Sequence, residues 1–569
     1  MKWTFAPEPD PAAVRHMEEV LNVPYKIARL LVRRGIESYD QARKFFKPSL
    51  DDIYDPYLMK DMDKAVRRIR EAMSRGEKIL VYGDYDVDGT TAVAILFSFL
   101  RERYPHLEFY IPDRNKEGYG ISFRGVDYAA DNGFGLMIAL DCGIKAVEQV
   151  KRARDRGVDV IIGDHHTPGE ELPPAVAILN PKQKDCKYPF KELSGAGIAF
   201  KIIQALNAEE GHTIDKIIPY LDLLAVSIAA DIVPIVDENR TLMYFGLQQL
   251  NLMPRPGLKV LMRTMRRKQW EVSDLVFVLA PRINSAGRME HGKLAVKLLI
   301  QTDDHKAEEL GALIEENNRE RRETDQKITD DALEKIEKHI DPSSYTTVVY
   351  DREWHKGVVG IVASRLIERF YRPTIVMTYS ETDNLWVGSA RSIHEFDLYD
   401  VLNSIEEHIH QFGGHKFAAG LSVKPEKMQD FIRAFEQEVR KRFPGGLPEP
   451  EIFIDDELDL IDISPKFYRL LKRFAPFGPG NMKPVFMTRG LRDSGFARRV
   501  GKDQNHLKLT LMDGTTRNFY AAIAFGKGDL LERVKQQNEF AAVYHLEENQ
   551  WNGRTTLQLN VKDIKFDFR

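Results

Sequence analysis

Acidic and imidazole side chains follow three short apolar runs of this chain, at the point where each run ends. In chain order they are Asp86 and Asp88 after residues 78–83, Asp141 after 136–140, and His165 and His166 after 158–163. In an open α/β sheet the carboxyl ends of the strands form the ligand crevice, so these side chains could converge on one spot. Carboxylate oxygens and a neutral imidazole nitrogen suit a divalent cation such as Mn²⁺ or Mg²⁺. The pattern therefore predicts a metal site.

The pair Asp86 and Asp88 has a physical reason to hold a cation. Residues two apart face the same side of a regular strand, and at a strand end they can share one loop. Two adjacent carboxylates repel each other unless a cation lies between them. An Asp-x-Asp pair by itself is more often a solvated turn, so the assignment depends on Asp141 and His165 at equivalent strand ends. A lone aspartate after an apolar segment is most often a cap, and Asp231 is a further candidate only because of these companions.

The composition sets the class of protein. A chain of 569 residues is too long for one hydrophobic core, so we expect several domains of ~100–200 residues. No segment approaches the ~20 apolar residues needed to cross a bilayer, and the first residues lack the apolar core of a signal peptide. Two cysteines, Cys142 and Cys186, argue against a disulfide framework, exclude a thiolate zinc cage and favour a cytoplasmic location. The net charge of −4 gives no global basic field, so a nucleic acid would need a local basic groove.

The order of helical and strand-like patterns divides the chain into segments. Strand-like runs at 79–82 and 136–140 are each followed by a helical pattern, which indicates βαβ units and a mostly parallel sheet. A Pro- and Gly-rich linker occupies residues 443–450. The expected segments are an N-terminal helical segment (1–75), an α/β domain (76–300), a connecting helix (301–342), a second α/β domain (343–443) and a C-terminal β domain (451–569).

Two of these segments have a distinct periodicity. No Pro or Gly interrupts residues 312–340, so one long helix could bridge two domains, although a solvated surface helix fits equally well. Its expected apolar stripe consists of Leu310, Leu313, Ile314, Ile328, Leu333 and Ile336. Alternation at Leu507, Leu509 and Leu511, and again at 555–561 after the hairpin dipeptide Asn552-Gly553, predicts a small barrel or sandwich.

The ordered motifs resemble those of the DHH phosphoesterase superfamily. Within it, the chain is similar, nearly from end to end, to the RecJ family of single-strand-specific exonucleases. The segments that carry the resemblance are 83–89, 112–120, 141–143, 164–166, 281–288, 354–365, 388–392, 412–420 and 476–481, together with Asp231. The resemblance implies a parallel-sheet DHH domain and a second, DHH-associated α/β domain joined by a long helix. It also implies that the C-terminal domain is an oligonucleotide-binding barrel.

The resemblance gives roles to the candidate ligands. One or two ions, Mn²⁺ or Mg²⁺, would be held by Asp86, Asp88, Asp141, His165 and Asp231. Asp141 would bridge two ions and His166 would stabilise charge that develops on the scissile phosphate, so these two residues are the catalytic candidates. A core or supporting imidazole is the alternative role for His166.

A second set of residues could bind the DNA strand. Guanidinium groups pair with phosphate oxygens, although a surface salt bridge is the ordinary role of an arginine. Gly-Gly lets the chain approach an anion, although a plain turn is the simpler interpretation. The expected substrate-binding residues are Arg114, Arg282, Asn284, Arg288, His355, Ser389, Arg391, Gly414 and His415. The barrel offers cations and aromatics, of which the aromatics could equally be core, namely Arg498, Arg499, Lys508, Phe519, Tyr520 and Trp551.

These features favour a metal-dependent exonuclease that degrades single-stranded DNA from its 5′ end to 5′-mononucleotides. The resemblance implies a role in DNA repair and recombination, a monomeric enzyme, and a helicase and a single-strand-binding protein as partners. A small-molecule relative, such as a pyrophosphatase, an oligoribonuclease or a cyclic-dinucleotide phosphodiesterase, is an alternative. Tyr82 in place of a histidine argues against the pyrophosphatase, and residues 451–569 argue against both it and the oligoribonuclease. Absent N-terminal membrane helices argue against the phosphodiesterase. A catalytically inactive binding or scaffold protein is a further alternative, disfavoured because all five ligand positions are present.

Overall fold

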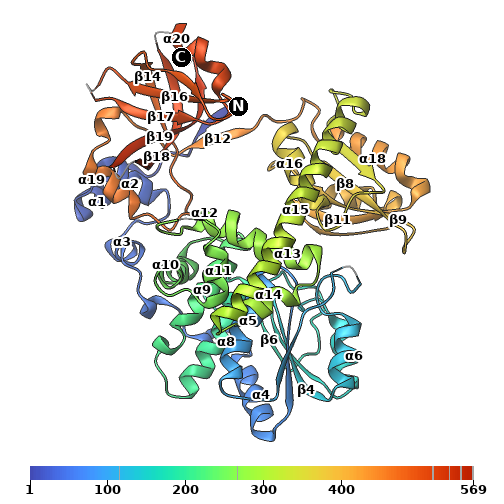
Figure 1. Ribbon diagram of the computed structural model, residues 1–569. Coiled ribbons are helices and arrows are strands. Elements are labelled where there is room, and N and C mark those ends of the chain that lie inside the picture. The colour runs from blue at the N-terminus through green and yellow to red at the C-terminus, as the bar shows by residue number, and fades with distance from the viewer. Residues whose placement is uncertain (115, 266, 516–517, 537–538, 552–553, 567–569) are drawn as a thin grey trace. The chain divides into compact units, whose positions relative to one another are not determined.

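The structure is a computed structural model that describes residues 1–114, 116–265, 267–515, 518–536, 539–551 and 554–566. The chain divides into two compact units, each described here by itself (Figure 1). Unit 1 consists of Met1–Asp55, Ile232–Gln248 and Glu451–Arg569, and unit 2 consists of Pro56–Asp231 and Gln249–Pro450. Unit 1 is therefore assembled from three separate stretches of sequence.

Unit 2 begins with a five-stranded sheet in which every neighbouring pair of strands is parallel. Its strands are β2 (Lys78–Gly83), β3 (Leu107–Tyr110), β4 (Phe134–Leu140), β5 (Asp159–Gly163) and β6 (Ala177–Leu179). The spatial order is β3-β2-β4-β5-β6, so the direction of winding reverses between β2 and β4. Ligands bind at such a switch point, outside the carboxyl ends of the strands. The predicted metal ligands follow these two strands and β5.

Helices cover both faces of this sheet, which explains why its strands are almost continuously apolar. The helices are α4 (Met62–Arg75), α5 (Val87–Arg101), α6 (Phe123–Asp131), α7 (Val147–Asp155), α8 (Gly195–Glu209) and α9 (Leu221–Ala230). Buried side chains of α6 and α7 share one core with alternate residues of β2, β4 and β5. Helices α5 and α8 pack on each other and lie on the opposite side of the strands from α6 (Figure 1).

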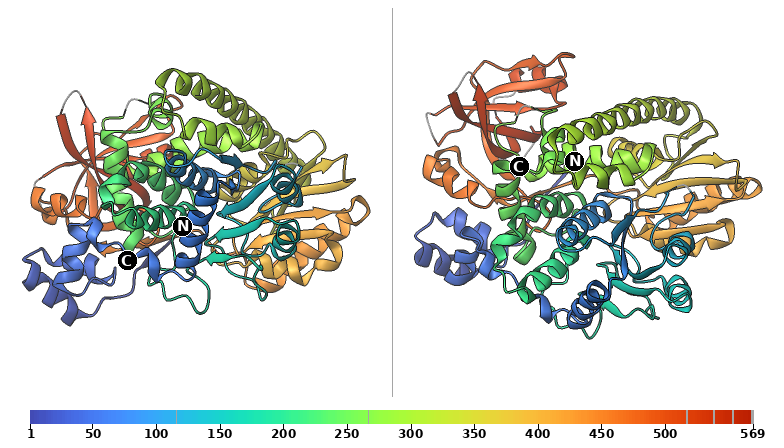
Figure 2. Two further views of the ribbon diagram at one scale, coloured as in Figure 1. Left: turned by 90° about the horizontal axis from the view of Figure 1, so that it is seen from below. Right: turned by 60° about the horizontal axis from the view of Figure 1, so that its bottom comes forward.

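A helical segment follows and ends in one long helix (Figures 1 and 2). Its elements are α10 (Asp237–Leu252), α11 (Pro256–Met262), α12 (Val272–Asp274), the π-helix η5 (Leu275–Leu279), α13 (Ala280–Met289), α14 (Lys293–Leu299) and α15 (Asp304–His339). Most of α10, up to Gln248, belongs to unit 1, and the other elements belong to unit 2. Helix α15 is continuous over 36 residues. Of its expected apolar stripe, Ile314, Ile328 and Ile336 are buried, whereas Leu313 is 53% exposed.

Polar side chains fill the middle of the buried face of α15. Arg321 donates to Asp325 Oδ2 over 3.0 Å and to Asn318 Oδ1 over 2.7 Å. Arg365 of a neighbouring helix reaches Asp325 Oδ1 over 2.6 Å. The apolar stripe does not predict this network. The side chains that form the network are polar or charged, and a hydropathy pattern assigns such residues to the solvent-facing side of a helix.

A second five-stranded sheet, of order β10-β11-β9-β8-β7, completes unit 2. Only β7 and β8 are parallel; the other neighbours are antiparallel. The elements are β7 (Thr347–Asp351), α16 (Val359–Phe370), β8 (Thr374–Ser380), β9 (Leu385–Arg391), α17 (Leu398–Ser404), β10 (Gln411–His415), β11 (Ala418–Val423) and α18 (Met428–Arg442). Helix α16 shares a core with α15 on one face, and α17 and α18 share a core on the other.

Unit 1 contains a seven-stranded sheet of order β13-β14-β18-β19-β17-β16-β15. Its strands are β13 (Asp456–Glu457), β14 (Phe486–Asp493), β15 (Arg498–Val500), β16 (His506–Met512), β17 (Tyr520–Ala524), β18 (Phe540–Trp551) and β19 (Arg554–Lys565), with helices α19 (Pro465–Lys472) and α20 (Leu531–Gln536). A further pairing of β14 with β16 curls the sheet back on itself, as in an oligonucleotide-binding barrel. Leu507, Leu509 and Leu511 all point into its core. The expected turn Asn552-Gly553 lies outside the described residues, between paired β18 and β19.

The N-terminal part of unit 1 differs from the expected helical segment 1–75. It begins with a strand, β1 (Lys2–Phe5), which pairs in parallel with β12 (Glu451–Ile454). Three helices follow, α1 (Pro11–Leu21), α2 (Tyr25–Val32) and α3 (Tyr39–Phe46), whereas α4 belongs to unit 2. The strand was not predicted because its only partner lies far away in the sequence, and four residues carry no clear periodicity.

The N-terminal helices and the barrel share one hydrophobic core. Arg240 joins the middle stretch of unit 1, Ile232–Gln248, to the other two, because its guanidinium donates to the carbonyl oxygens of Phe45 and Phe474 over 3.0 and 2.9 Å. Segment 476–481 has a structural role in this packing. Asn481 donates to two carbonyl oxygens of its own loop, and Pro479 accepts from the Ile235 amide over 2.7 Å.

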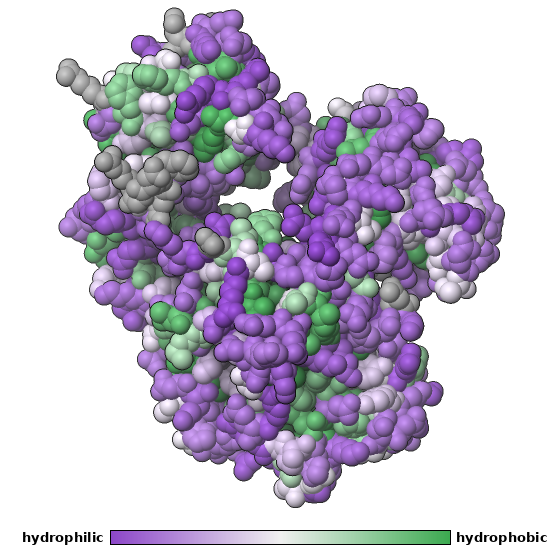
Figure 3. Space-filling view, viewed as in Figure 1, coloured by the Kyte–Doolittle hydropathy of each residue, from purple (hydrophilic) through white to green (hydrophobic). Residues whose placement is uncertain are grey.

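The face shown in Figure 3 is mainly hydrophilic, with scattered apolar residues. Among the described residues, no helix is both long enough and apolar enough to cross a membrane.

Candidate active site

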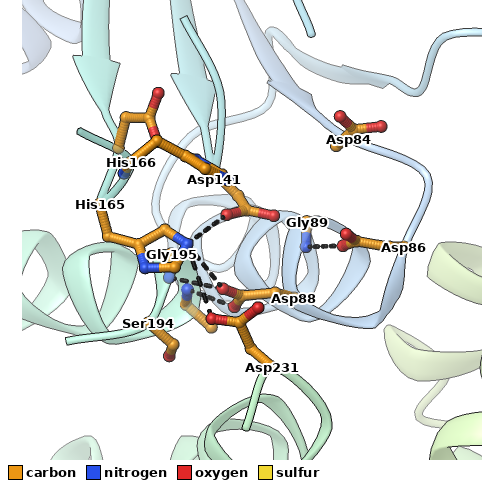
Figure 4. A network of polar contacts seen from close by, with 12 residues as sticks. Asp84, Asp86, Asp88, Gly89, Asp141, His165, His166, Ser194, Gly195 and Asp231 are labelled. Carbon is orange, nitrogen blue, oxygen red and sulfur yellow. Dashed lines mark hydrogen bonds and ion pairs between the residues drawn. The ribbon is translucent and has the colours of Figure 1, made fainter. Parts of the chain in front are cut away.

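Four of the five predicted ligands, Asp88, Asp141, His165 and Asp231, meet near the carboxyl ends of β2, β4 and β5, whereas the carboxylate of Asp86 lies beside them (Figure 4). Asp86 is the N-cap of α5, where its side chain accepts from the Gly89 amide over 2.9 Å, and Asp88 lies in the first turn of that helix. Asp141 follows β4, His165 follows β5, and Asp231 is the C-cap of α9. Asp86 and Asp88 therefore belong to a strand-to-helix junction rather than to a strand.

His165 is at the centre of the cluster. Its Nε2 lies 3.2 Å from Asp141 Oδ1, 3.7 Å from Asp88 Oδ2 and 3.6 Å from Asp231 Oδ2 (Figure 4). Both ring nitrogens of His165 and Oδ1 of Asp141 are buried and have no hydrogen-bond partner among the described residues. A buried polar atom without a partner is costly. Together with the carboxylates of Asp88 and Asp231, these atoms have the donor chemistry of a Mn²⁺ or Mg²⁺ site.

The electrostatics of the cluster also favour binding of a cation. Burial, and then the neighbouring Asp88 and Asp86, raise the pKa of Asp141 well above its usual value. The same causes raise the pKa of Asp231 to about 8. Burial lowers the pKa of His165, which keeps its ring neutral and able to act as a ligand. A bound divalent cation would stabilise the ionised carboxylates that these surroundings otherwise disfavour.

The N-terminus of α8 holds Asp88 in place. Its carboxylate accepts from the amides of Gly195 and Ala196 over 2.7 and 2.8 Å, and from Ser227 Oγ over 2.7 Å. A side chain at Gly195 would put its Cβ 2.5 Å from the Cβ of Asp141, so only glycine fits there. These residues were not predicted from the sequence, although Ser194 before Gly195-Ala196-Gly197 is a typical signal of a helix start.

His166 points to a different side of the site and is fixed by two neighbours. Its Nδ1 lies 2.7 Å from Asp164 Oδ1, and its Nε2 lies 3.2 Å from the hydroxyl of Tyr119. Burial opposes protonation of the ring, but the hydrogen bond and the charge of Asp164 outweigh it and raise the pKa of His166. The side chain is 42% exposed, so it can reach a substrate. Tyr119 is a site residue that the sequence analysis placed in a motif but gave no role.

A cavity of about 200 Å³ lies beside the carboxylates. Arg114, Asn284 and Arg288 line it together with Asp86, Asp88 and Asp231. Burial, and then the neighbouring Arg114, lower the pKa of Arg288 to about 9. The cavity therefore combines a cation-binding wall with a guanidinium wall, an arrangement that suits a phosphate bridging the two.

Two other expected substrate residues lie apart from this cavity lining. Arg282 forms an ion pair with Glu315 and donates to the Val278 carbonyl, so it fastens α13 to α15. His355 is exposed and accepts from the Gly357 amide through Nδ1 over 3.1 Å. Gly357 in turn accepts from Arg288 over 3.0 Å, which connects the loop of His355 to the cavity wall.

Three of the remaining expected residues, Ser389, Arg391 and His415, share one face of the second sheet, whereas Gly414 alternates to the other face. Pairing aligns Ser389 with Gly420 and Gly413, and Arg391 with Ala418 and His415. Arg391 donates to Ser389 Oγ over 2.7 Å and to Ser364 Oγ of α16 over 3.2 Å.

Gly414 has φ +155°, and a Cβ there would lie 2.3 Å from the Ala418 carbonyl oxygen. Burial, and then Arg391 and His166, lower the pKa of His415. Ser389, Arg391 and His415 therefore form a cluster of hydrogen-bond donors.

The barrel residues divide into surface and core. Arg498, Arg499 and Lys508 are exposed, and Phe519 is 58% exposed. The hydroxyl of Tyr520 donates to the Ile463 carbonyl over 3.0 Å, and its ring packs on the core, so it has a structural role. The side chain of Trp551 lies outside the described residues.

Fold and site together define a metal-dependent phosphoesterase of the DHH type. Three family descriptions match: the DHH family N-terminal domain over residues 78–228, the DHHA1 domain over 343–441 and the RecJ OB domain over 454–563. The chain belongs to the RecJ family of single-stranded-DNA-specific exonucleases.

Relatives with that description are similar over nearly the whole chain. The protein from Bacillus subtilis is 39% identical over 99% of this chain and 70% of its own length. The protein from Escherichia coli is 32% identical over 97% of this chain and 98% of its own length. The crystal structure of RecJ from Thermus thermophilus in complex with Mn²⁺ has a TM-score of 0.85 at 28% identity, covering 99% of this chain and 79% of that one. A second structure of the Thermus protein contains Mg²⁺.

Proposed function

We propose that this protein is a Mn²⁺- or Mg²⁺-dependent exonuclease that hydrolyses single-stranded DNA from its 5′ end and releases 5′-mononucleotides. The observation that carries the proposal is the convergence of Asp88, Asp141 and Asp231 on a buried His165 whose ring nitrogens have no hydrogen-bond partner among the described residues. Two arginines line the adjoining cavity. Relatives at 31–39% identity over most of their length are described as single-stranded-DNA-specific exonucleases.

The ligands hold the reacting groups in position. A metal bound by Asp86, Asp88, Asp141, His165 and Asp231 would supply a water of lowered pKa and neutralise charge on the phosphate. Asp164 accepts the hydrogen of His166 Nδ1, which leaves Nε2 directed to the exposed side of the site. A protonated His166 donates from Nε2 to a phosphate oxygen and stabilises the charge that develops there. Arg114 and Arg288 hold other phosphate oxygens on the opposite wall.

The cluster of hydrogen-bond donors on the second sheet supports the proposed polarity. Ser389, Arg391 and His415 offer donors on one face, and the hydrogen bonds of Arg391 within the described part of the chain go to hydroxyl and carbonyl oxygens. We assign this cluster to the terminal 5′ phosphate. An anchor at the strand end fixes which phosphodiester reaches the metal and so produces 5′→3′ hydrolysis with mononucleotide release.

The metal assignment is tested by removing single ligands. Asp88→Ala and Asp141→Ala should each abolish Mn²⁺ binding and hydrolysis, because each removes a metal ligand. The variants should stay folded, because loss of a carboxylate relieves repulsion in the metal-free site. Metal content after dialysis, circular dichroism and a single-strand nuclease assay measure these effects. Full Mn²⁺-dependent activity in either variant would refute the assignment.

The polarity assignment is tested at Arg391. Arg391→Ala should lower turnover about ten- to a hundredfold, because it removes a charge-assisted contact that contributes roughly 1.5–3 kcal/mol. The loss should be larger on 5′-phosphorylated strands than on 5′-hydroxyl strands, because only the former carry the anion. Arg369→Ala, an exposed arginine of α16, is the matched control. Equal impairment of Arg391→Ala on both strand types would assign Arg391 to an internal phosphate.

The wider role is also part of the proposal. We propose a function in DNA repair and recombination, with a helicase that opens the duplex and a single-strand-binding protein as partners, and a monomeric, cytoplasmic enzyme. The two cysteines, Cys142 and Cys186, are buried and free, which fits a reducing compartment. Gel filtration and co-purification with tagged protein test the oligomeric state and the partners.

A further inference from the structure

Phe277 is an exposed aromatic residue on an element that otherwise faces the core. It lies in the π-helix η5, where Leu275, Val278 and Leu279 are buried. The side chain of Phe277 is 77% exposed. π-Helical turns are rare in proteins, and those that occur are often found at functional sites. Single exposed apolar residues are common. Exposure of Phe277 therefore indicates a function only if the residue lies close to the site.

Phe277 is on the helix that lines the cavity. Residues 272–289 form one continuous helical stretch, and Asn284 and Arg288 in it line the cavity beside the metal ligands. Asn284 follows Phe277 by two helical turns and Arg288 by three, so the three side chains lie on about the same side of the helix. At ~1.5 Å per residue, Phe277 is about 10 Å from Asn284 along the axis. That distance corresponds to about three stacked nucleotides at ~3.4 Å each.

Cationic side chains lie next to this helix. Arg267 Nη2 is 3.1 Å from Asp274 Oδ1, and Asp274 is the last residue of α12, less than one turn before Phe277. The ion pair holds the loop before α12 against this helix. The next residue of the loop, Lys268, is exposed. Exposed cations beside an aromatic ring are the combination that binds single strands, because phosphates and base faces are satisfied together.

We propose that Phe277 is a stacking platform for a base of the single-stranded substrate, about three nucleotides on the 3′ side of the scissile phosphate, with Arg267 and Lys268 near the adjoining backbone. The proposal rests on the proposed function and extends it to substrate selection. Both faces of a base inside a duplex are already stacked on its neighbours, so the Phe277 ring is available only to an unpaired strand. The platform adds to the preference for single-stranded DNA at a distance from the metal.

The test uses the full chain and 5′-phosphorylated decanucleotides that each carry one 2-aminopurine, in chelator so that no hydrolysis occurs. Wild-type protein should quench the probe at about the fourth position more than at the distal positions, because a stacked 2-aminopurine loses fluorescence. Phe277→Ala should remove that quenching and weaken binding about tenfold, the effect of one lost base–aromatic stack of ~1–3 kcal/mol. Phe277→Trp should restore both. Phe123→Ala, which removes a 48% exposed phenylalanine of α6, is the matched control.

Activity with Mn²⁺ separates the inference from the proposed function. Phe277→Ala should raise the KM for long strands about tenfold and leave hydrolysis of a dinucleotide unchanged, since a dinucleotide is too short to reach the ring. A Phe277→Ala variant with wild-type affinity and unchanged quenching would overturn the inference, while single-strand hydrolysis by that variant would leave the proposed function intact. Loss of hydrolysis from wild-type protein itself would instead refute the proposed function. Thermal melts of the variants identify any effect that comes from folding.

Discussion

Asp164 is the residue that fixes the orientation of the second histidine of the site. Its Oδ1 lies 2.7 Å from His166 Nδ1 and accepts from the His166 amide over 3.1 Å, while Oδ2 accepts from the Ile144 amide over 2.9 Å. Burial opposes ionisation, but the contacts with His166 and Ile144 hold the pKa of Asp164 below its usual value. A buried, ionised Asp164 therefore determines which nitrogen of His166 faces the substrate.

Asp164→Asn should lower kcat about 10–100-fold and leave KM nearly unchanged, because the neutral amide no longer stabilises a protonated His166. If Asp164 acts through His166, the double variant with His166→Ala should be no slower than His166→Ala alone. Steady-state kinetics on 5′-phosphorylated single strands measure this. Additive losses in the double variant would show that Asp164 has an independent role.

The metal-free protein should lose stability as the pH rises. The pKa of Asp231 in the folded state is raised to about 8 by burial and by its neighbours Asp88 and Asp86, so the folded state binds a proton that the unfolded state has released. Stability that is present below about pH 4 is lost progressively as the pH approaches about 8. In chelator, the Tm should be lower at about pH 8.5 than at about pH 6, and Mn²⁺ should raise it most at the higher pH. Asp231→Asn should flatten the dependence; an unchanged slope would contradict this origin.

At the scale of elements, α15 is held to the second α/β domain by buried ions as well as by apolar contacts. Asp325 has no exposed side-chain surface and pairs with Arg321 and Arg365. Arg321 is 11% exposed and Arg365 38% exposed. A buried carboxylate is tolerated only with such partners, and removal of one partner leaves an uncompensated charge. The network sets how α15 and α16 pack within unit 2.

Asp325→Ala should lower the free energy of unfolding by about 3 kcal/mol, since it leaves the guanidinium groups of Arg321 and Arg365 without their carboxylate partner next to a low-dielectric interior. Glu323→Ala, an exposed residue of the same helix, should change it by less than about 0.5 kcal/mol. Chemical denaturation followed by circular dichroism measures both. Equal effects of the two substitutions would exclude the buried network as a source of stability.

At the scale of the molecule, unit 1 is a cooperative assembly of its three stretches. The helices α1 to α3 and the barrel contribute to one hydrophobic core. Deletion of the chain after Phe443 would therefore expose buried residues of the N-terminal helices, in addition to removing the barrel. Surface substitutions on the barrel are the cleaner test of its part in binding.

The paired cations Arg498 and Lys508 lie opposite each other on β15 and β16 and are exposed. Their joint replacement by alanine should weaken binding of a long single strand and reduce the slope of log K against log salt by about 0.7 for each lost phosphate contact. Hydrolysis of a dinucleotide should not change, because the barrel supplies no metal ligand. A salt titration of binding by fluorescence anisotropy provides the measurement; an unchanged slope would remove this face of the barrel from the binding surface.

The local features of the fold and site could be predicted from short stretches of sequence. The apolar runs before Asp86, Asp141 and His165 predicted three parallel strands, and the rule that ligands gather at the carboxyl ends of such strands predicted that these residues meet. The alternation at 507–511 and the uninterrupted pattern at 312–340 likewise predicted strand β16 and helix α15. Each of these inferences depends on periodicity over a few residues, which backbone geometry alone dictates.

The tertiary structure decided what depends on distant partners. The approach of Asp231 to His165, the support of Asp88 by the start of α8, and the pairing of Arg282 with Glu315 each join residues that are far apart in the sequence. The strand β1, the buried charges of α15 and the three-part composition of unit 1 are of the same kind. No local pattern encodes these contacts, because charge and hydropathy indicate whether a side chain prefers burial and not which neighbour makes burial favourable.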